Sequence, residues 1–176
     1  MDRQRVLEGE RLLLRPLRAE DRAALYAVAS DPQVWAQHPL PDRWREDVFA
    51  ALFEELLAAG ALVAIDKADG RIVGSSRYLD FEGGGLEIGT TFLACSHWGR
   101  GFNLEMKRLM LRHALASVDR VVFRVGRDNV RSRTAMTRIG ARLIDDQYVV
   151  MVAGRELPHV LFEITREDFA SGPLAA

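Results

Sequence analysis

The chain has 176 residues, a length that suits one domain with a full hydrophobic core. Hydrophobic residues make up 48% and charged residues 28%, and the net charge of -1 is unlike the basic surplus of most nucleic-acid-binding proteins. The single cysteine, Cys95, excludes an internal disulfide and fits a reducing compartment. No apolar run approaches the ~20 residues of a membrane helix, and the first residues lack the apolar segment of a signal peptide, so we expect a cytoplasmic protein.

Apolar periodicity and turn residues predict the elements of the first 60 residues: a strand at 11–17, a helix at 20–30, a short helical segment at 33–37 and a helix at 42–57. Asp42 is the candidate N-cap of the last helix. Val48, Leu52 and Leu56 fall on one stripe of it, and Gly60 fits its C-terminal stop.

The rest of the chain alternates strands and helices. Strands are expected at 61–67, 71–79, 86–93, 120–125, 141–144, 147–152 and 159–164, and helices at 103–117 and 130–139. We expect Leu104, Leu111, Leu115 and Val118 to form the buried stripe of the helix at 103–117, and residues 170–176 to fray. The order of elements predicts a single α/β domain with helices around one mixed sheet.

The motif Gly99-Arg100-Gly101 lies between a predicted strand and a predicted helix. Glycine permits a positive φ and close approach of a ligand, and a helix N-terminus presents unpaired N–H groups to an anion. The P-loop pattern is absent, and only the first two glycines of the dinucleotide fingerprint are present. A pyrophosphate-binding loop matches imperfectly, and a simple turn into a helix is the remaining interpretation.

Three segments in order resemble the GNAT superfamily of acyl-CoA-dependent N-acetyltransferases: Glu87-Ile88-Gly89, Trp98-Gly99-Arg100-Gly101 and Asp128-Asn129 with Ser132. The resemblance covers about residues 11–164 and is strongest to the branch of the RimJ/RimL-type ribosomal-protein acetyltransferases. It implies a mostly antiparallel sheet, flanked by helices and splayed where acetyl-CoA binds.

By this resemblance, the backbone of Phe92, Leu93 and Ala94 pairs with the pantetheine arm of acetyl-CoA. The loop that binds the pyrophosphate comprises Trp98, Gly99, Arg100, Gly101, Phe102, Asn103 and Leu104. Asn129 binds the pantetheine, with Ser132 beside it, and a plain helix N-cap is the other interpretation of Asn129. Two positions depart from the wider family pattern. Asn103 stands where glycine or alanine is usual, and Trp98 stands where arginine or glutamine is usual.

The resemblance also implies the catalytic groups. A backbone N–H near Leu93 would stabilise the oxyanion, and Glu87 would act as general base through water. Glu87 is equally open to interpretation as a solvent-facing carboxylate or a salt-bridge partner. Ser132 is the candidate proton donor to the leaving thiolate, although it also suits a small residue in the first turn of a helix. Met136, where many relatives carry a tyrosine, cannot donate a proton.

The expected activity is direct transfer of an acetyl group from acetyl-CoA to a primary amine, either a protein N-terminus or a small molecule. The net charge of -1 gives a slight preference for a cationic acceptor. Alternatives are a non-catalytic CoA-binding or sensory module and a nucleotide-binding protein that uses the glycine loop alone. We expect no metal, nucleic-acid or membrane partner, and a homodimer through the late strands or residues 35–44 is conceivable.

Overall fold

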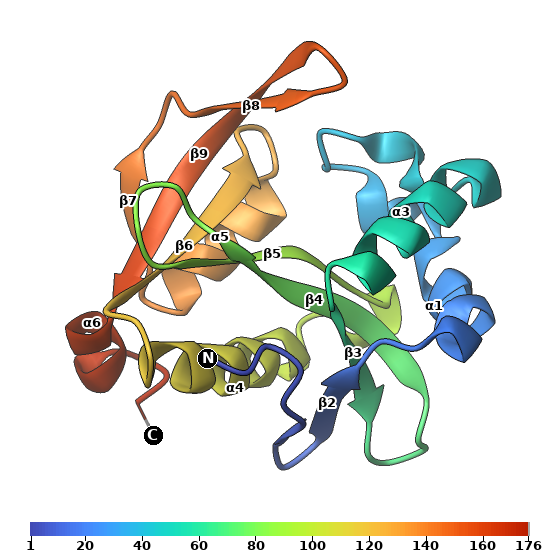
Figure 1. Ribbon diagram of the computed structural model, residues 1–176, viewed down its shortest axis with the longest axis horizontal. Coiled ribbons are helices and arrows are strands. Elements are labelled where there is room, and N and C mark those ends of the chain that lie inside the picture. The colour runs from blue at the N-terminus through green and yellow to red at the C-terminus, as the bar shows by residue number, and fades with distance from the viewer. Residues whose placement is uncertain (176) are drawn as a thin grey trace. The chain divides into compact units, whose positions relative to one another are not determined.

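The computed structural model describes residues 1–175 and includes nine strands among them (Figure 1). Their hydrogen-bonding order is β1-β2-β3-β4-β5-β6-β9-β7, with β8 paired to β9. The bounds are β1 Leu7–Glu8, β2 Leu12–Pro16, β3 Leu62–Asp66, β4 Ile72–Asp80, β5 Leu86–Leu93, β6 Arg120–Gly126, β7 Arg142–Asp145, β8 Val149–Val152 and β9 Arg155–Thr165. The ladder between β5 and β6 is parallel, whereas β9 is antiparallel to β6, β7 and β8. The predicted mixed, mostly antiparallel sheet is confirmed.

The described residues form two compact units, and the first comprises 1–36, 40–78 and 88–110. It contains β1 to β3, most of β4 and β5, and the helices α1 (Arg22–Ala29), α2 (Pro32–Trp35) and α3 (Glu46–Ala58), together with the start of α4 (Phe102–Leu115). Figure 1 shows α1 and α3 side by side in blue and teal. Their apolar faces close over one side of the strands.

The core of the first unit is rich in aromatic side chains. Phe49, Phe53 and Leu56 of α3 are almost fully buried with Leu25 of α1 and Val63 of β3. Leu52 and Leu56 of the stripe predicted for α3 are buried, but Val48 is only half-buried, because the buried face of the helix is turned towards Phe49 and Phe53. The φ of +66° at Gly60 allows the chain to turn directly after α3.

The opposite face of β4 and β5 packs against α4. Tyr78 donates its hydroxyl hydrogen to the Met110 carbonyl at 2.9 Å, and Lys107 donates to Thr91 Oγ1 at 2.8 Å. Burial raises the pKa of Tyr78 above its usual value. Residues on alternate positions of β4 therefore serve two different helix layers within this unit.

The second unit comprises 37–39, 79–87 and 111–175 of the described residues. It contains the first residues of β5, all of β6 to β9, and the helices α5 (Val130–Arg138) and α6 (Arg166–Ser171). β9 is the long strand that pairs with β6 along one side and with β7 and β8 along the other (Figure 1). The parallel ladder of β5 with β6 joins Leu86 to Val121 and Glu87 to Val122.

The structure corrects the start of α3. Residues Pro41–Trp44 form a 3-10 turn, and the helix begins at Glu46 after Arg45, so Asp42 is not its N-cap. Proline lacks an N–H and has a fixed φ, which suits the first position of a short turn. The acidic side chains expected at a helix start are supplied by Glu46 and Asp47.

Two further expectations differ from the structure. Leu104 is 38% exposed and does not belong to the buried stripe of α4, which includes Met106, Met110 and Leu111. The last residues, which we expected to fray, include the end of α6 and Leu174, whose exposed fraction is 7%. Ala176, also in that expected frayed tail, lies outside the described residues.

Candidate active site

The loop before α4 presents a run of unpaired backbone N–H groups. None of the six amides from Gly99 to Leu104 donates a hydrogen bond of normal geometry within residues 1–175, whereas the next amide, of Glu105, donates to the Gly101 carbonyl at 3.0 Å. Gly99 and Gly101 have φ values of +70° and +84°, which turn the chain so that these amides open one helix N-terminus. Such a run of donors is suited to a phosphate or pyrophosphate anion.

Two side chains from distant parts of the sequence hold this loop. Arg11 of the N-terminal region donates from Nη1 to the Arg100 carbonyl at 2.7 Å and from Nε to Glu105 Oε2 at 3.0 Å. Glu105 Oε1 also accepts the backbone N–H groups of Arg11 and Leu12. Burial raises the pKa of Glu105, but these hydrogen bonds and the Arg11 charge outweigh it and leave the pKa below its usual value.

The predicted loop residues differ in their surroundings. Phe102 is buried, and its ring lies against His97 and against the guanidinium groups of Arg11 and Arg100. Arg100 is exposed, with its Nη1 donating to the Ser96 carbonyl at 3.3 Å. Asn103 is half-buried in the first turn of α4. Phe102 therefore anchors the loop, while Arg100 keeps an exposed positive charge at its rim.

At the end of β5, one edge of the backbone already makes hydrogen bonds within the chain. The Ala94 N–H donates to the Val73 carbonyl at 2.8 Å, and the Ala94 carbonyl accepts the His97 N–H at 2.9 Å. The Leu93 carbonyl accepts Nε1 of Trp98 at 3.0 Å. Because backbone groups alternate along a strand, the Leu93 N–H points away from the edge that Ala94 uses. Of the three residues expected to pair with pantetheine, Ala94 therefore has no unpaired N–H to offer.

Asn129 caps α5 in the second unit. Its Oδ1 accepts the Ser132 N–H at 3.1 Å, and its exposed fraction is 8%. The N-cap interpretation is thus confirmed, and the Nδ2 group has no hydrogen-bond partner among the described residues. Ser132 is half-buried in the first turn, and its hydroxyl likewise has no partner there. Each keeps one polar group for a ligand.

Replacing Asn129 by aspartate separates its two roles. The aspartate side chain would keep the oxygen that caps α5, so the free energy of unfolding should change by less than about 0.5 kcal/mol. It would lose the Nδ2 donor, so acetyl-CoA affinity measured by calorimetry should fall by about three- to tenfold. In Asn129→Ala the cap is also lost, and stability should drop by about 1 kcal/mol. Equal affinity of Asn129→Asp and the parent protein would limit Asn129 to capping.

Glu87 is a buried ion-pair partner. It is 5% exposed, and its Oε2 accepts hydrogen bonds from Nε and Nη2 of Arg124 on β6. Burial lowers the pKa of Arg124, but the hydrogen bond and charge of Glu87, together with Tyr148, outweigh it and raise the pKa above its usual value. The solvent-facing interpretation of Glu87 is wrong, and the salt-bridge interpretation is confirmed.

Several residues of these sites were not expected from the sequence. Arg11 and Glu105 hold the glycine loop, and Arg124, which itself interacts with Tyr148, pairs with Glu87. Their partners lie tens of residues away in the chain, so no local spacing marks them. The one available signal was the placement of Glu105 in the first turn of α4, where a carboxylate is favoured by the helix dipole.

Other candidate sites are not found in the part of the chain that the structure describes. Residues 1–175 contain no group of three or more His, Cys, Asp or Glu side chains that could hold a metal ion. Every described helix is too short or too polar to cross a membrane. Cys95 is a half-buried thiol and belongs to no disulfide.

The chain is similar to known proteins in sequence and in fold. Residues 11–142 match the model of the acetyltransferase (GNAT) domain. A GCN5-related N-acetyltransferase from Brucella melitensis is 20% identical with a TM-score of 0.81, over 96% of this chain and 81% of that chain. RimJ from Mycobacterium smegmatis in complex with CoA-disulfide is 21% identical with a TM-score of 0.75, over 98% and 92%. Spermidine N-acetyltransferase from Vibrio cholerae with CoA and spermine is 15% identical with a TM-score of 0.68, over 93% and 100%.

Proposed function

Because the chain belongs to the acetyltransferase (GNAT) family, we propose that it moves an acetyl group from acetyl-CoA to a primary amine by direct attack in a ternary complex. The observation that carries this proposal is the run of amides from Gly99 to Leu104, none of which donates a hydrogen bond of normal geometry within residues 1–175. Every helix start leaves four N–H groups unpaired, and the glycine loop adds those of Gly99 and Arg100 to the donors available to an anion.

We assign the cofactor residues to two groups. In the first unit, the amides of residues 99–104 would hold the pyrophosphate, and Arg100 would add charge at the rim. Phe92 and Leu93 would line the pantetheine arm, with Trp98 fixing the Leu93 carbonyl at 3.0 Å. In the second unit, the Nδ2 of Asn129 would donate to the pantetheine.

When bound, acetyl-CoA supplies a thioester carbonyl with a thiolate leaving group. The N–H of Leu93 would donate to the carbonyl oxygen as negative charge develops on it. Glu87 would accept the amine proton through water, with Arg124 holding the carboxylate in one orientation. Ser132 would give a proton to the departing sulfur, since Met136 has no proton to donate.

The acceptor and the setting belong to this proposal as well. Similar solved structures include a putative ribosomal-protein-serine acetyltransferase and a spermidine N-acetyltransferase, both from Vibrio cholerae, so a protein amine and a small amine both remain acceptors in this proposal. We place the chain in the RimJ/RimL-like branch and in the cytoplasm, and keep a homodimer open. A non-catalytic CoA-binding module is the second candidate, supported by the buried Met136 at the position where a tyrosine acid is common.

Calorimetric titration with acetyl-CoA, NADH and ATP tests the proposal. We expect selective acetyl-CoA binding in the micromolar range and turnover when a primary amine is added. Binding without turnover on any amine would favour the non-catalytic module. Stronger binding of ATP or NADH would replace the acetyltransferase by a nucleotide-binding function of the glycine loop.

A further inference from the structure

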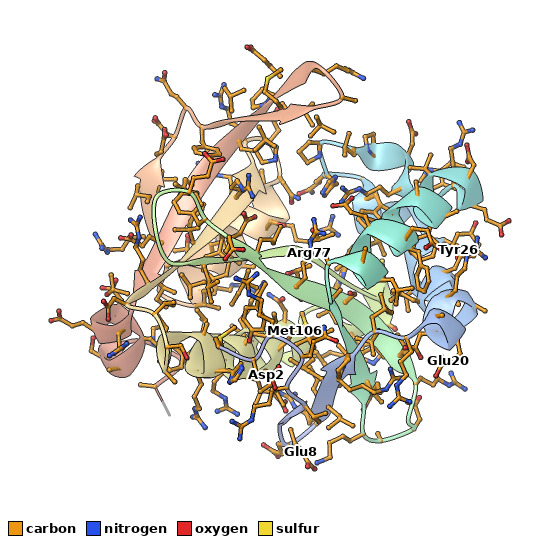
Figure 2. All side chains as sticks on the ribbon, viewed as in Figure 1. Asp2, Glu8, Glu20, Tyr26, Arg77 and Met106 are labelled. Atoms are coloured by element: carbon orange, nitrogen blue, oxygen red, sulfur yellow. The ribbon has the colours of Figure 1, made fainter. Side chains whose placement is uncertain are left out.

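Arg77 of β4 is a buried cation that the proposed chemistry does not use. The residue is 8% exposed, and its Nη2 donates to Glu55 Oε1 of α3 at 2.6 Å. Figure 2 labels Arg77 beside β4, near α3. Its Nε is buried without a hydrogen-bond partner, the one such side-chain atom in the described part of the chain. Leaving a buried N–H unpaired is unfavourable, and the described residues supply no partner for this atom.

A second arginine, Arg43, feels the charge of the same carboxylate. The guanidinium carbon of Arg43 lies 5.6 Å from the centre of the Trp35 ring. The pKa of Arg43 is lowered to about 10, mainly because the residue is buried. The negative charge of Glu55 raises this pKa, and the positive charge of Arg77 lowers it further. Glu55 itself is exposed over 56% of its side chain. The half-solvated carboxylate of Glu55 therefore pairs with Arg77 and also acts on Arg43 through its charge.

Arg43 lies one aromatic ring away from the end of β5. The rings of Trp35 and Phe92 are 5.0 Å apart between centroids, and Phe92 directly precedes Leu93. Trp35 is 2% exposed, and its Nε1 donates to the Ala29 carbonyl at 2.8 Å. Because Trp35 is held by Phe92 and by the Ala29 carbonyl, packing fixes the distance from Arg43 to the strand that would carry the oxyanion donor.

We propose that the acceptor amine carries a carboxylate, which the guanidinium group of Arg77 binds in the field of Arg43. A planar guanidinium matches a carboxylate in geometry and charge, and the bound oxygen would satisfy the Arg77 Nε. This inference rests on the proposed acetyl transfer and names its substrate class. It replaces the slight preference for a cationic acceptor that the net charge suggests, because local charge rather than net charge decides recognition.

Product binding tests the inference without turnover. N-acetylalanine, N-acetylalaninamide and an N-acetylated peptide amide with one glutamate are titrated by calorimetry, with and without CoA. The protein variants are Arg77→Met, which keeps the apolar stem, and Glu55→Gln, which removes the competing carboxylate. Arg71→Met is the matched control, since Arg71 is 82% exposed in the turn between β3 and β4.

The two variants should shift anion binding in opposite directions. The parent protein should favour N-acetylalanine over its amide by at least about tenfold, a preference that Arg77→Met abolishes and Glu55→Gln increases. Arg71→Met should leave it unchanged. A preference for the glutamate peptide instead would place the carboxylate on a side chain of a peptide acceptor and still support the inference.

Other outcomes overturn the inference. Equal binding of N-acetylalanine and N-acetylalaninamide would overturn it, and so would no binding of either compound. A Glu55→Gln protein that melts at a lower temperature without a larger preference for N-acetylalanine would also overturn it. Acetyl-CoA binding by the same samples is read separately. Its absence would remove the proposed acetyl transfer, while the acid-to-amide ratio without CoA would still decide the anion site.

Discussion

Gly101→Val should lower acetyl-CoA affinity by about 100-fold or more, the equivalent of two lost charge-assisted hydrogen bonds. At a φ of +84°, valine would force the backbone out of the shape that aligns the loop amides. A Cβ at this position would also lie 2.8 Å from Nη2 of Arg11, the side chain that holds the Arg100 carbonyl. Calorimetric titration with acetyl-CoA measures the loss.

Gly70→Val is the matched control for backbone strain. Gly70 has a φ of +73° in the exposed turn between β3 and β4, and a Cβ there would meet no atom within 4 Å. Both variants should lose about 1–3 kcal/mol of unfolding free energy, because valine is strained at positive φ. Only Gly101→Val should lose the cofactor. If the two proteins bound acetyl-CoA equally, the loop would be no more than a turn entering a helix.

Glu87→Gln should reduce kcat by about 100-fold or more and flatten the pH–rate profile. A general base accepts the proton of the amine, and the neutral amide of glutamine cannot do so. The pH dependence of the variant would then come from deprotonation of the acceptor amine alone. Steady-state kinetics across pH, with acetyl-CoA affinity measured in parallel, separate loss of catalysis from loss of binding.

Glu163→Gln is the control for loss of a buried ion pair. Glu163 is 9% exposed on β9 and accepts from Arg120 at 3.0 Å and Arg142 at 3.1 Å. Both glutamine variants should lose about 1–3 kcal/mol of stability, but only Glu87→Gln should change the pH profile. An unchanged profile would leave Glu87 as the partner of Arg124 alone. Ser132→Ala in the same series should lower kcat, and full activity would remove Ser132 as proton donor.

Local patterns in the sequence were sufficient for most of the fold. Strand β5 was predicted with its observed bounds, and the turn at Asp69-Gly70 and the stop at Gly60 follow from glycine at positive φ. The start of α3 was wrong because an aspartate after a proline satisfies both a helix N-cap and a 3-10 turn. Only the packing of Phe49 and Leu52 decides where the helix begins.

For the candidate site too, some features could be predicted from the sequence and others could not. The turn at Gly99 and Gly101 and the capping by Asn129 could be predicted because backbone conformation and helix capping act over a few residues. The sequence could not decide whether Glu87 faces solvent or forms a salt bridge, because its partner, Arg124, is 37 residues away in the chain. The parallel ladder of β5 with β6 brings the two residues together. Leu104 was misplaced because the periodicity of α4 allows two neighbouring stripes. Met106 and Met110, flexible side chains that suit irregular gaps, fill the one that is buried.

The link between Arg11 and Glu105 has a consequence for the order in which the protein folds. The two residues are 94 positions apart, so the shape of the glycine loop depends on closing a long stretch of chain. Non-local contacts of this kind form late, after local helices and turns. A peptide covering only the loop and α4 would therefore be a poor ligand for phosphate, although it contains every amide of the cradle. Cofactor affinity would appear during refolding together with the native tertiary structure, and not with the helix itself.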